Sequence, residues 1–122
     1  MEHLHSVLNI ATGQSRRSIA KLFSDKKVTA EQWSVLRALS KKQMRQVELQ
    51  KVLNKDKGNV SRMLVRMVRN KWVSKEKDLS LTCEGRALLK DLNALVATKD
   101  TFASELTSED RSTLVSLLEK LT

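Results

Sequence analysis

The sequence predicts a mainly α-helical domain that contains one short β-hairpin. Apolar residues recur at intervals of three and four along most of the chain, which is the spacing of one helix face. The chain has no Pro and three Gly, a composition that suits long helices and few elaborate loops. Two short runs between residues 72 and 82 have the pattern of strands. At 122 residues, the chain is long enough for one domain with its own hydrophobic core.

Two helices are predicted before residue 42. The first runs from residue 4 to about residue 23, interrupted at Gly13, and its apolar positions are Leu4, Val7, Leu8, Ala11, Ile19, Leu22 and Phe23. After a polar joint at 25–27, Thr29 and Gln32 form a capping box, in which each side chain satisfies a backbone N–H. The helix that they begin ends near Ser40 and places three apolar residues on one side: Trp33, Leu36 and Leu39.

The next two helices are joined by a turn at 54–57. The first runs from Gln46 to Leu53 and is expected to turn Val47, Val52 and Leu53 inward. Asp56 is placed to cap the second, which runs to about Asn70. At about 100° per residue, one arc of this helix about 140° wide is apolar and consists of Val60, Met63, Leu64, Met67 and Val68. The opposite side carries Gly58, Arg62, Arg66 and Arg69.

The hairpin and two more helices complete the chain. Residues 72–76 and 79–82 are expected to form two strands about a tight turn at Lys77 and Asp78, and Thr82 can cap the helix that follows. A partial heptad predicts that this helix is long and packs along another; its members are Leu88, Leu92, Leu95, Phe102 and Leu106. A last helix from Ser108 is expected to bury Leu114, Leu117, Leu118 and Leu121.

The net charge of the chain lies in one stretch. Residues Lys41 to Lys77 contain twelve Lys or Arg against three acids, a balance of +9, and the remaining 85 residues hold eleven of each sign. Positive charge at this density attracts polyanions and steers their approach. Because the same stretch holds two short helices joined by a turn and then a hairpin, the sequence indicates a helix-turn-helix that binds nucleic acid.

The residues expected to contact DNA lie in this stretch. A charged helix face is most often simply solvated, but within this concentration of charge the arginines suit a role in binding guanine bidentately. Asn59 and Ser61 lie near the helix start and are expected to reach bases or phosphates. Gln46 begins the preceding helix, which often crosses the DNA backbone. The full set is Gln46, Lys55, Lys57, Asn59, Ser61, Arg62, Arg66, Arg69, Lys75 and Lys77.

The order of elements and five segments resemble the MarR family of bacterial transcription regulators, which have a winged helix-turn-helix core. The similarity covers residues from about 16 to the end and is densest at 29–36, 47–53, 60–64, 68–73 and 81–85. It implies that the helix from Lys57 to Asn70 is the recognition helix. Family members usually have a longer wing with an Asp-Arg pair near its tip, whereas this hairpin has no Arg. Lys75 and Lys77 remain able to reach phosphates.

The resemblance also implies a homodimer built by the two terminal regions. The chain is then one domain, with a DNA-binding core at 29–82 and dimerisation helices at 1–28 and 83–122. The apolar patterning of the terminal regions, richer than a minimal winged helix needs, supports this division. The expected dimerisation residues are Leu4, Val7, Leu8, Leu88, Leu92, Leu95, Leu114 and Leu118.

Other functional classes find little support. No nucleophile-base arrangement or phosphate-cradling glycine loop is present, so an enzyme is not predicted. His3 and His5 lack the acids or cysteines of a metal site, and no cofactor is expected. Cys83, the single cysteine, is interpreted as a half-buried residue at a helix start rather than a redox sensor. No apolar run is long enough to cross a membrane, and a reduced, cytoplasmic setting is expected.

Two alternatives to a sequence-specific regulator remain. One is an architectural or centromere-like DNA-binding protein, which the sequence alone does not separate from a repressor. The other is a winged-helix protein-interaction module, against which the basic stretch argues. Many MarR-family members bind small phenolic compounds in a cleft, but this chain has no Tyr and little aromatic surface to line one. The predicted partners are therefore double-stranded DNA and a second copy of the chain, without an assigned small-molecule effector.

Overall fold

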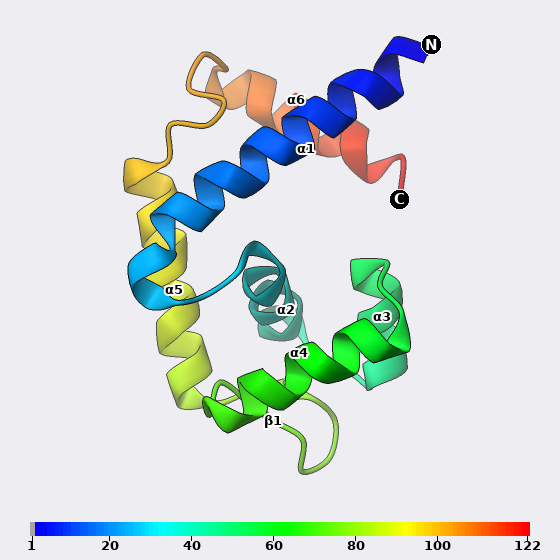
Figure 1. Cartoon of the computed structure of the whole chain (residues 1–122), viewed down its shortest axis with the longest axis vertical. Coiled ribbons are helices and arrows are strands. Elements are labelled where there is room, and N and C mark those ends of the chain that lie inside the picture. The colour runs from blue at the N-terminus through cyan, green and yellow to red at the C-terminus, as the bar shows by residue number, and fades with distance from the viewer. Residues whose placement is uncertain (1) are drawn as a thin grey trace.

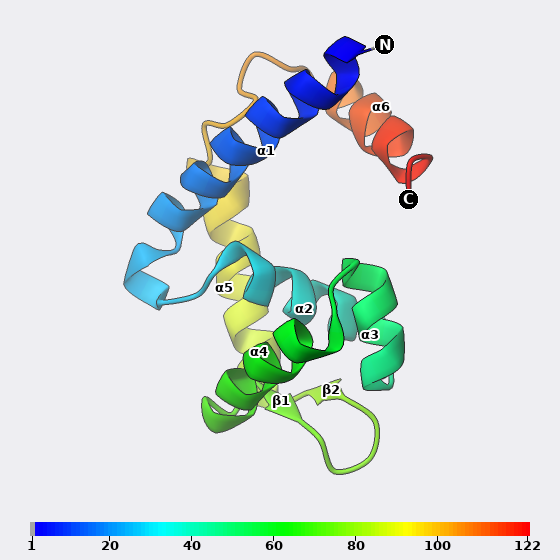
Figure 2. The ribbon, with the colours of Figure 1, turned by 45° about the vertical axis from the view of Figure 1, so that its right-hand side comes forward.

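The computed structural model describes residues 2–122 as a helical molecule with a small β-hairpin at one end (Figure 1). Helices α1 and α6 lie at the opposite end, and α5 runs between the two ends (Figure 2). The helices in chain order are α1 Glu2–Leu22, the 3₁₀ turn η1 Ser24–Lys26, α2 Ala30–Lys41, α3 Gln46–Leu53, α4 Lys57–Arg69, α5 Cys83–Lys99 and α6 Ser108–Glu119. The predicted mainly helical fold with one hairpin is confirmed.

Helix α2 lies at the centre of the domain, where it packs against α1, α3, α5 and the second strand. Its start is fixed by the predicted capping box: Thr29 Oγ1 accepts from the Gln32 N–H and Gln32 Oε1 accepts from the Thr29 N–H, both at 3.1 Å. Val35 and Leu36 on its inner side have no exposed surface. The hydrophobic core around them draws on helices α1 to α5 and both strands, and includes Phe23, Leu49, Leu64 and Leu92.

The hairpin is shorter in its strands and longer in its loop than the sequence predicted. Strand β1 (Val73–Ser74) pairs antiparallel with β2 (Ser80–Leu81), in the register Val73 opposite Leu81. The predicted tight turn at Lys77 and Asp78 is therefore wrong, because residues 75–79 connect the strands. Leu79 is held instead by Met44: the Met44 N–H donates to the Leu79 carbonyl at 3.2 Å, and the Leu79 N–H donates back at 2.8 Å.

Three predictions about apolar faces are also wrong. In α3, Val47 and Val52 are 55% and 61% exposed, and the fully buried residue is Leu49. Helix α5 ends at Lys99, so Phe102 and Leu106 lie in the connection to α6 and do not extend a heptad. Asp100 takes extended backbone there, and its carboxylate accepts from Ser18 Oγ at 2.8 Å and from the Phe102 N–H at 3.0 Å. Within the single chain, all of α6 is exposed, including the leucines expected to be buried.

Every helix within residues 2–122 is too short or too polar to cross a membrane. The first predicted helix is confirmed, but the interruption expected at Gly13 is wrong, because α1 is continuous from Glu2 to Leu22.

Candidate nucleic-acid interface

The start of α4 is determined by two local features of the turn before it. Asn54 adopts the left-handed conformation, at φ 53°, and ends α3. This is the conformation that Asn tolerates better than most residues. Asp56 then caps α4 as predicted, with Oδ1 accepting from the Asn59 N–H at 2.8 Å. Together, the two residues set the direction in which α4 leaves α3.

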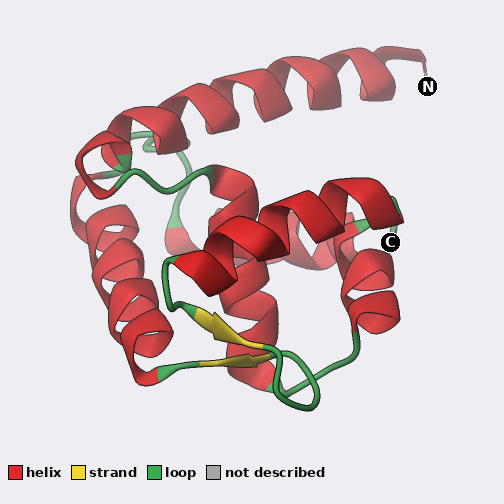
Figure 3. Ribbon diagram, turned by 60° about the horizontal axis from the view of Figure 1, so that its bottom comes forward, coloured by secondary structure: helices red, strands yellow, loops and turns green. Residues whose placement is uncertain are grey.

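Helix α4 has one buried face and one charged face, as the sequence predicted. Val60, Leu64 and Met67 have no exposed surface, and Met63 is 9% exposed. Arg62, Arg66 and Arg69 are all exposed on the other side. Figure 3 shows α4 crossing the surface with the hairpin beside its C-terminal half. The arginines therefore project from a rigid helix that its buried face holds against the core.

Gln46 and Ser61 contact each other across the α3–α4 corner. Gln46 Nε2 donates to Ser61 Oγ at 2.8 Å, and both side chains are partly buried. The sequence had placed both residues among the DNA contacts separately. The structure brings them together at one point on the surface, where the first residue of α3 meets the first turns of α4.

Asn59, Arg62 and Arg66 line one side of a cavity of about 210 Å³ between α4 and the start of α2. The other side is formed by Thr29, Glu31 and Gln32. Lys57 is exposed in the first turn of α4. Lys55 is half-buried, with Nζ 3.8 Å from Glu31 Oε2 on α2. In the free chain it forms an ion pair between the turn and α2, and its place among the expected DNA contacts stays a prediction.

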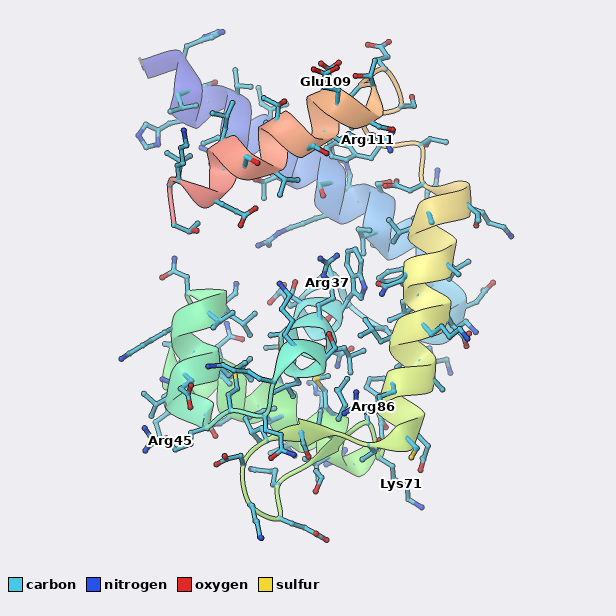
Figure 4. The ribbon with its side chains drawn as sticks, turned by 180° about the vertical axis from the view of Figure 1, so that it is seen from behind. Arg37, Arg45, Lys71, Arg86, Glu109 and Arg111 are labelled. Carbon is cyan, nitrogen blue, oxygen red and sulfur yellow. The ribbon has the colours of Figure 1, made fainter. Side chains whose placement is uncertain are left out.

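The wing begins at a well-formed helix end. The Lys71 N–H donates to the Val68 carbonyl at 2.9 Å and the Trp72 N–H donates to the Met67 carbonyl at 3.0 Å, the pattern of a Schellman motif. Lys71 takes the left-handed conformation that this motif requires, at φ 65°. Lys75 and Lys77 are exposed in the loop beyond β1. Figure 4, viewed from behind, shows Lys71 and Arg45 at the end of the molecule that carries the hairpin.

Two of the three acids in the basic stretch are already engaged. Asp56 caps α4, and Glu48 lies 3.5 Å from Lys42 Nζ and 3.9 Å from Arg45 Nε. The hydrogen bond from the Arg45 backbone N–H, with the charges of Lys42 and Arg45 nearby, lowers the pKa of the Glu48 carboxyl. Glu48 thus stays ionised and offsets Lys42 and Arg45, while the arginines of α4 take no part in these two ion pairs.

The expected dimerisation residues divide into two groups. Leu4 and Val7 on α1 and Leu114 on α6 are 49%, 48% and 44% exposed, and Leu118 is 36% exposed. Leu8 is half-buried, and Leu88 and Leu95 are half-buried against the core. Leu92 has no exposed surface at all, so its assignment to the dimer interface is wrong and it is a core residue of the single chain. It faces the core because it lies one turn from Leu88 and Leu89 on the inner side of α5.

Cys83 and the two tryptophans differ in how far they are buried. Cys83 is the first residue of α5, as expected, but its side chain is exposed and not half-buried. Trp33 is half-buried against Phe23, with ring centroids 5.4 Å apart, and its Nε1 donates to Asn93 Oδ1 at 3.0 Å. Arg37 Cζ lies over the Trp33 ring, 5.2 Å from the ring centroid. Trp72 is half-buried between α4 and the hairpin.

One residue of the charged face was missed by the sequence analysis. Val65 is 52% exposed, although it is apolar and lies in the middle of α4. Helical periodicity already indicated that Val65 is exposed, since it falls about 140° from Val60 and outside the apolar arc. The helix therefore presents a valine beside its arginines.

The fold and the surface of α4 define a class of protein, a winged-helix DNA-binding protein. A profile described as the MarR family matches residues 28–80. The reduced form of MarR from E. coli has 30% sequence identity to this chain, with a TM-score of 0.81 over 97% of this chain and 92% of that one. The chain belongs to the MarR family, whose members are transcription regulators that bind DNA as dimers.

Other solved structures agree with this assignment. A cysteine variant of E. coli MarR complexed with operator DNA is 29% identical, with a TM-score of 0.80 over 97% of this chain and 92% of that chain. The transcriptional repressor CouR, bound to p-coumaroyl-CoA, is 25% identical, with a TM-score of 0.85 over 97% of this chain and 90% of that one. A comparison with curated protein sequences finds no significant match.

Proposed function

We propose that the chain regulates transcription as a homodimer that binds a near-palindromic operator, with α4 of each protomer in the major groove. The observation that carries the proposal is the division of α4 into a buried apolar face and an exposed face with three arginines. This helix lies within the stretch from Lys41 to Lys77, which holds the net charge of the chain. A major groove admits one such helix.

The contacts divide into those that position the protein and those that read sequence. Arg62 and Arg66 project from the exposed face and are proposed to bind guanine O6 and N7. Arg69, Lys57, Lys75 and Lys77 are exposed around them and are proposed to neutralise phosphates. The hairpin contains no Arg, so minor-groove reading by the wing forms no part of the proposal. Specificity would then rest mainly on α4.

The dimer is proposed to form through α1 and α6, within the terminal regions 1–28 and 83–122. All of α6 is exposed in the single chain, and its leucines would be covered by a second copy. A two-fold axis places two α4 helices about one turn of DNA apart, roughly 10 bp. We place this activity in the cytoplasm and assign it no small-molecule effector and no enzymatic reaction.

The proposal is tested by selecting bound sequences from a random duplex pool and repeating the binding measurement at several salt concentrations. The expected result is one near-palindromic site whose affinity falls by orders of magnitude from low to moderate salt, because each neutralised phosphate releases condensed counterion. Enrichment of no sequence, with footprints that spread along the duplex, would indicate an architectural protein instead. Absence of binding at low salt would contradict both.

A further inference from the structure

Val65 lies on the face of α4 that carries the arginines. Counted at about 100° per residue from Val60, Ser61 falls near 100°, Val65 near 140°, Arg69 near 180° and Arg62 near 200°. Val65 is 52% exposed, whereas Val60 has no exposed surface. An isolated exposed valine is ordinary on most surfaces. This one stands between a hydroxyl group and two guanidinium groups on the helix proposed to enter the major groove.

Ser61, one turn before Val65, has its hydroxyl set by a neighbour. Gln46 Nε2 donates to Ser61 Oγ at 2.8 Å, so the oxygen accepts that bond and keeps its own proton to donate. Residues four apart on a helix have Cβ atoms about 5–6 Å apart. Ser61 and Val65 therefore present a hydrogen-bond donor and a branched apolar group side by side.

We infer that Val65 and Ser61 together read thymine in the operator, with Val65 against the 5-methyl group and Ser61 donating to an acceptor on the same base edge or the next. This inference rests on the proposed function, since it requires α4 in the major groove. Thymine is the base that carries a methyl group in that groove, and its O4 acceptor lies beside the methyl. Gln46 acts as a positioning residue, because its hydrogen bond orients the Ser61 hydroxyl without itself needing to reach the base.

The inference predicts a chemically specific loss. Uracil differs from thymine only in lacking the 5-methyl group, so it keeps O4 and every other hydrogen-bonding group. Burying one methyl group is worth about 0.8 kcal/mol, which corresponds to about a fourfold change in affinity. When a single thymine at the read position of either half-site is replaced by uracil, wild-type binding should therefore weaken about fourfold.

The experiment measures binding to the selected site in which each thymine in turn is replaced by uracil. Three variants accompany the wild type: Val65→Ala, Ser61→Ala and, as a matched control, Val52→Ala, a valine on α3 that is 61% exposed against 52% for Val65. Val65→Ala removes the contact in both protomers, so it should bind thymine-containing DNA about 16-fold more weakly and be nearly insensitive to uracil at the read position. Ser61→Ala should weaken binding to the thymine and uracil sites alike, and Val52→Ala should behave as the wild type.

Each result has a separate consequence. If the wild type binds a selected site but uracil weakens binding nowhere, or Val65→Ala keeps the full uracil sensitivity, the thymine assignment is overturned while the proposed function stands. If Ser61→Ala binds every site as tightly as the wild type, the role of Ser61 is overturned. If no sequence is selected from the random pool, the proposed function fails, and this inference fails with it.

Discussion

At the residue scale, the side chains on α4 differ in what they can do although they share one face. Arg62 and Arg66 are exposed and face away from Val60 and Leu64, which have no exposed surface. A planar guanidinium can bind two acceptors of one guanine, whereas the ammonium group of a lysine is a mobile point charge. The arginines of α4 and the lysines of the wing should therefore contribute specificity and affinity in different proportions.

The first prediction follows from that difference. Arg62→Ala or Arg66→Ala should each cost about 1–3 kcal/mol on the selected site and relax the preference at one base pair. Lys75→Ala or Lys77→Ala should weaken binding to all sequences alike and slightly lower the salt dependence. Competition binding against matched and scrambled sites separates the two patterns. Arg37→Ala is the control, since Arg37 lies on α2 against Trp33. If replacing the wing lysines changes the sequence preference while replacing the arginines does not, the proposed placement of α4 in the major groove is refuted.

A second residue-scale prediction concerns the packing of α5 against the start of the wing. A Cβ atom on Gly85 would lie 2.1 Å from the Trp72 carbonyl oxygen, a backbone atom that the neighbouring elements hold in place. Gly85→Ala should therefore lower the free energy of unfolding by about 1–3 kcal/mol, measured by chemical denaturation. Gly13→Ala is the matched control: its Cβ would meet only Arg17 Nη1, at 3.7 Å, so it should stabilise α1 by up to about 1 kcal/mol. Equal effects at the two glycines would contradict the packing argument.

At the scale of elements, the sequence predicted the helices better than it predicted their exposed and buried faces. The caps at Thr29, Asp56 and Thr82 are local interactions between residues three apart, and all three form as expected. The predicted inward face of α3 was wrong because eight residues are too few to distinguish an apolar stripe when four valines and leucines are spread around the helix. The partial heptad was wrong because Asp100 ends α5 through a bond to Ser18, a residue distant in sequence.

The hairpin and the candidate site show the same limit. The register of the hairpin strands depends on the pairing of Leu79 with Met44, and Met44 lies in a connector that has no strand pattern of its own. The arginines of α4 were predictable from helical periodicity alone, as was the exposure of Val65. The pairing of Gln46 with Ser61 and of Lys55 with Glu31 was not, since each joins two elements whose relative placement is left undetermined by periodicity.

The third prediction concerns the end of α4. Lys71 holds a left-handed conformation, which costs an L-residue with a side chain about 1 kcal/mol and costs Gly little. Lys71→Gly should therefore raise the free energy of unfolding by about 0.5–1 kcal/mol. Lys71→Ala removes the same charge without that conformational freedom and serves as the control. Thermal and denaturant unfolding measure the free energies of unfolding of the two variants. A glycine variant no more stable than the alanine variant would contradict the assignment of the helix end.

At the scale of the whole molecule, the net positive charge and most of the exposed large apolar residues lie at opposite ends. The hairpin end carries Arg45 and Lys71 with the rest of the basic stretch, and the other end carries α1 and α6 (Figures 1 and 4). Exposed large apolar residues on those two helices include Leu4, Val7, Ile10, Leu114, Val115 and Leu117. A helix in water with no buried side chain has little tertiary support, because packing of an apolar face supplies most helical stability. Helix α6 is therefore expected to be stable only when a second copy covers it.

The last prediction tests that expectation. Leu114 and Leu118 lie four residues apart on α6 and so share one face. Replacing both with Ala should weaken dimerisation roughly 100-fold, since two apolar contacts are lost in each protomer. Analytical ultracentrifugation over a range of protein concentrations measures the change.

The same double variant should bind a full palindrome more weakly than the wild type does. It should bind a single half-site as tightly as the wild type, because α4 is untouched. Val52→Ala controls for the loss of an exposed apolar side chain elsewhere. A wild-type chain that is monomeric at micromolar concentration, or a double variant that dimerises as tightly as the wild type, would refute a dimer held by α6.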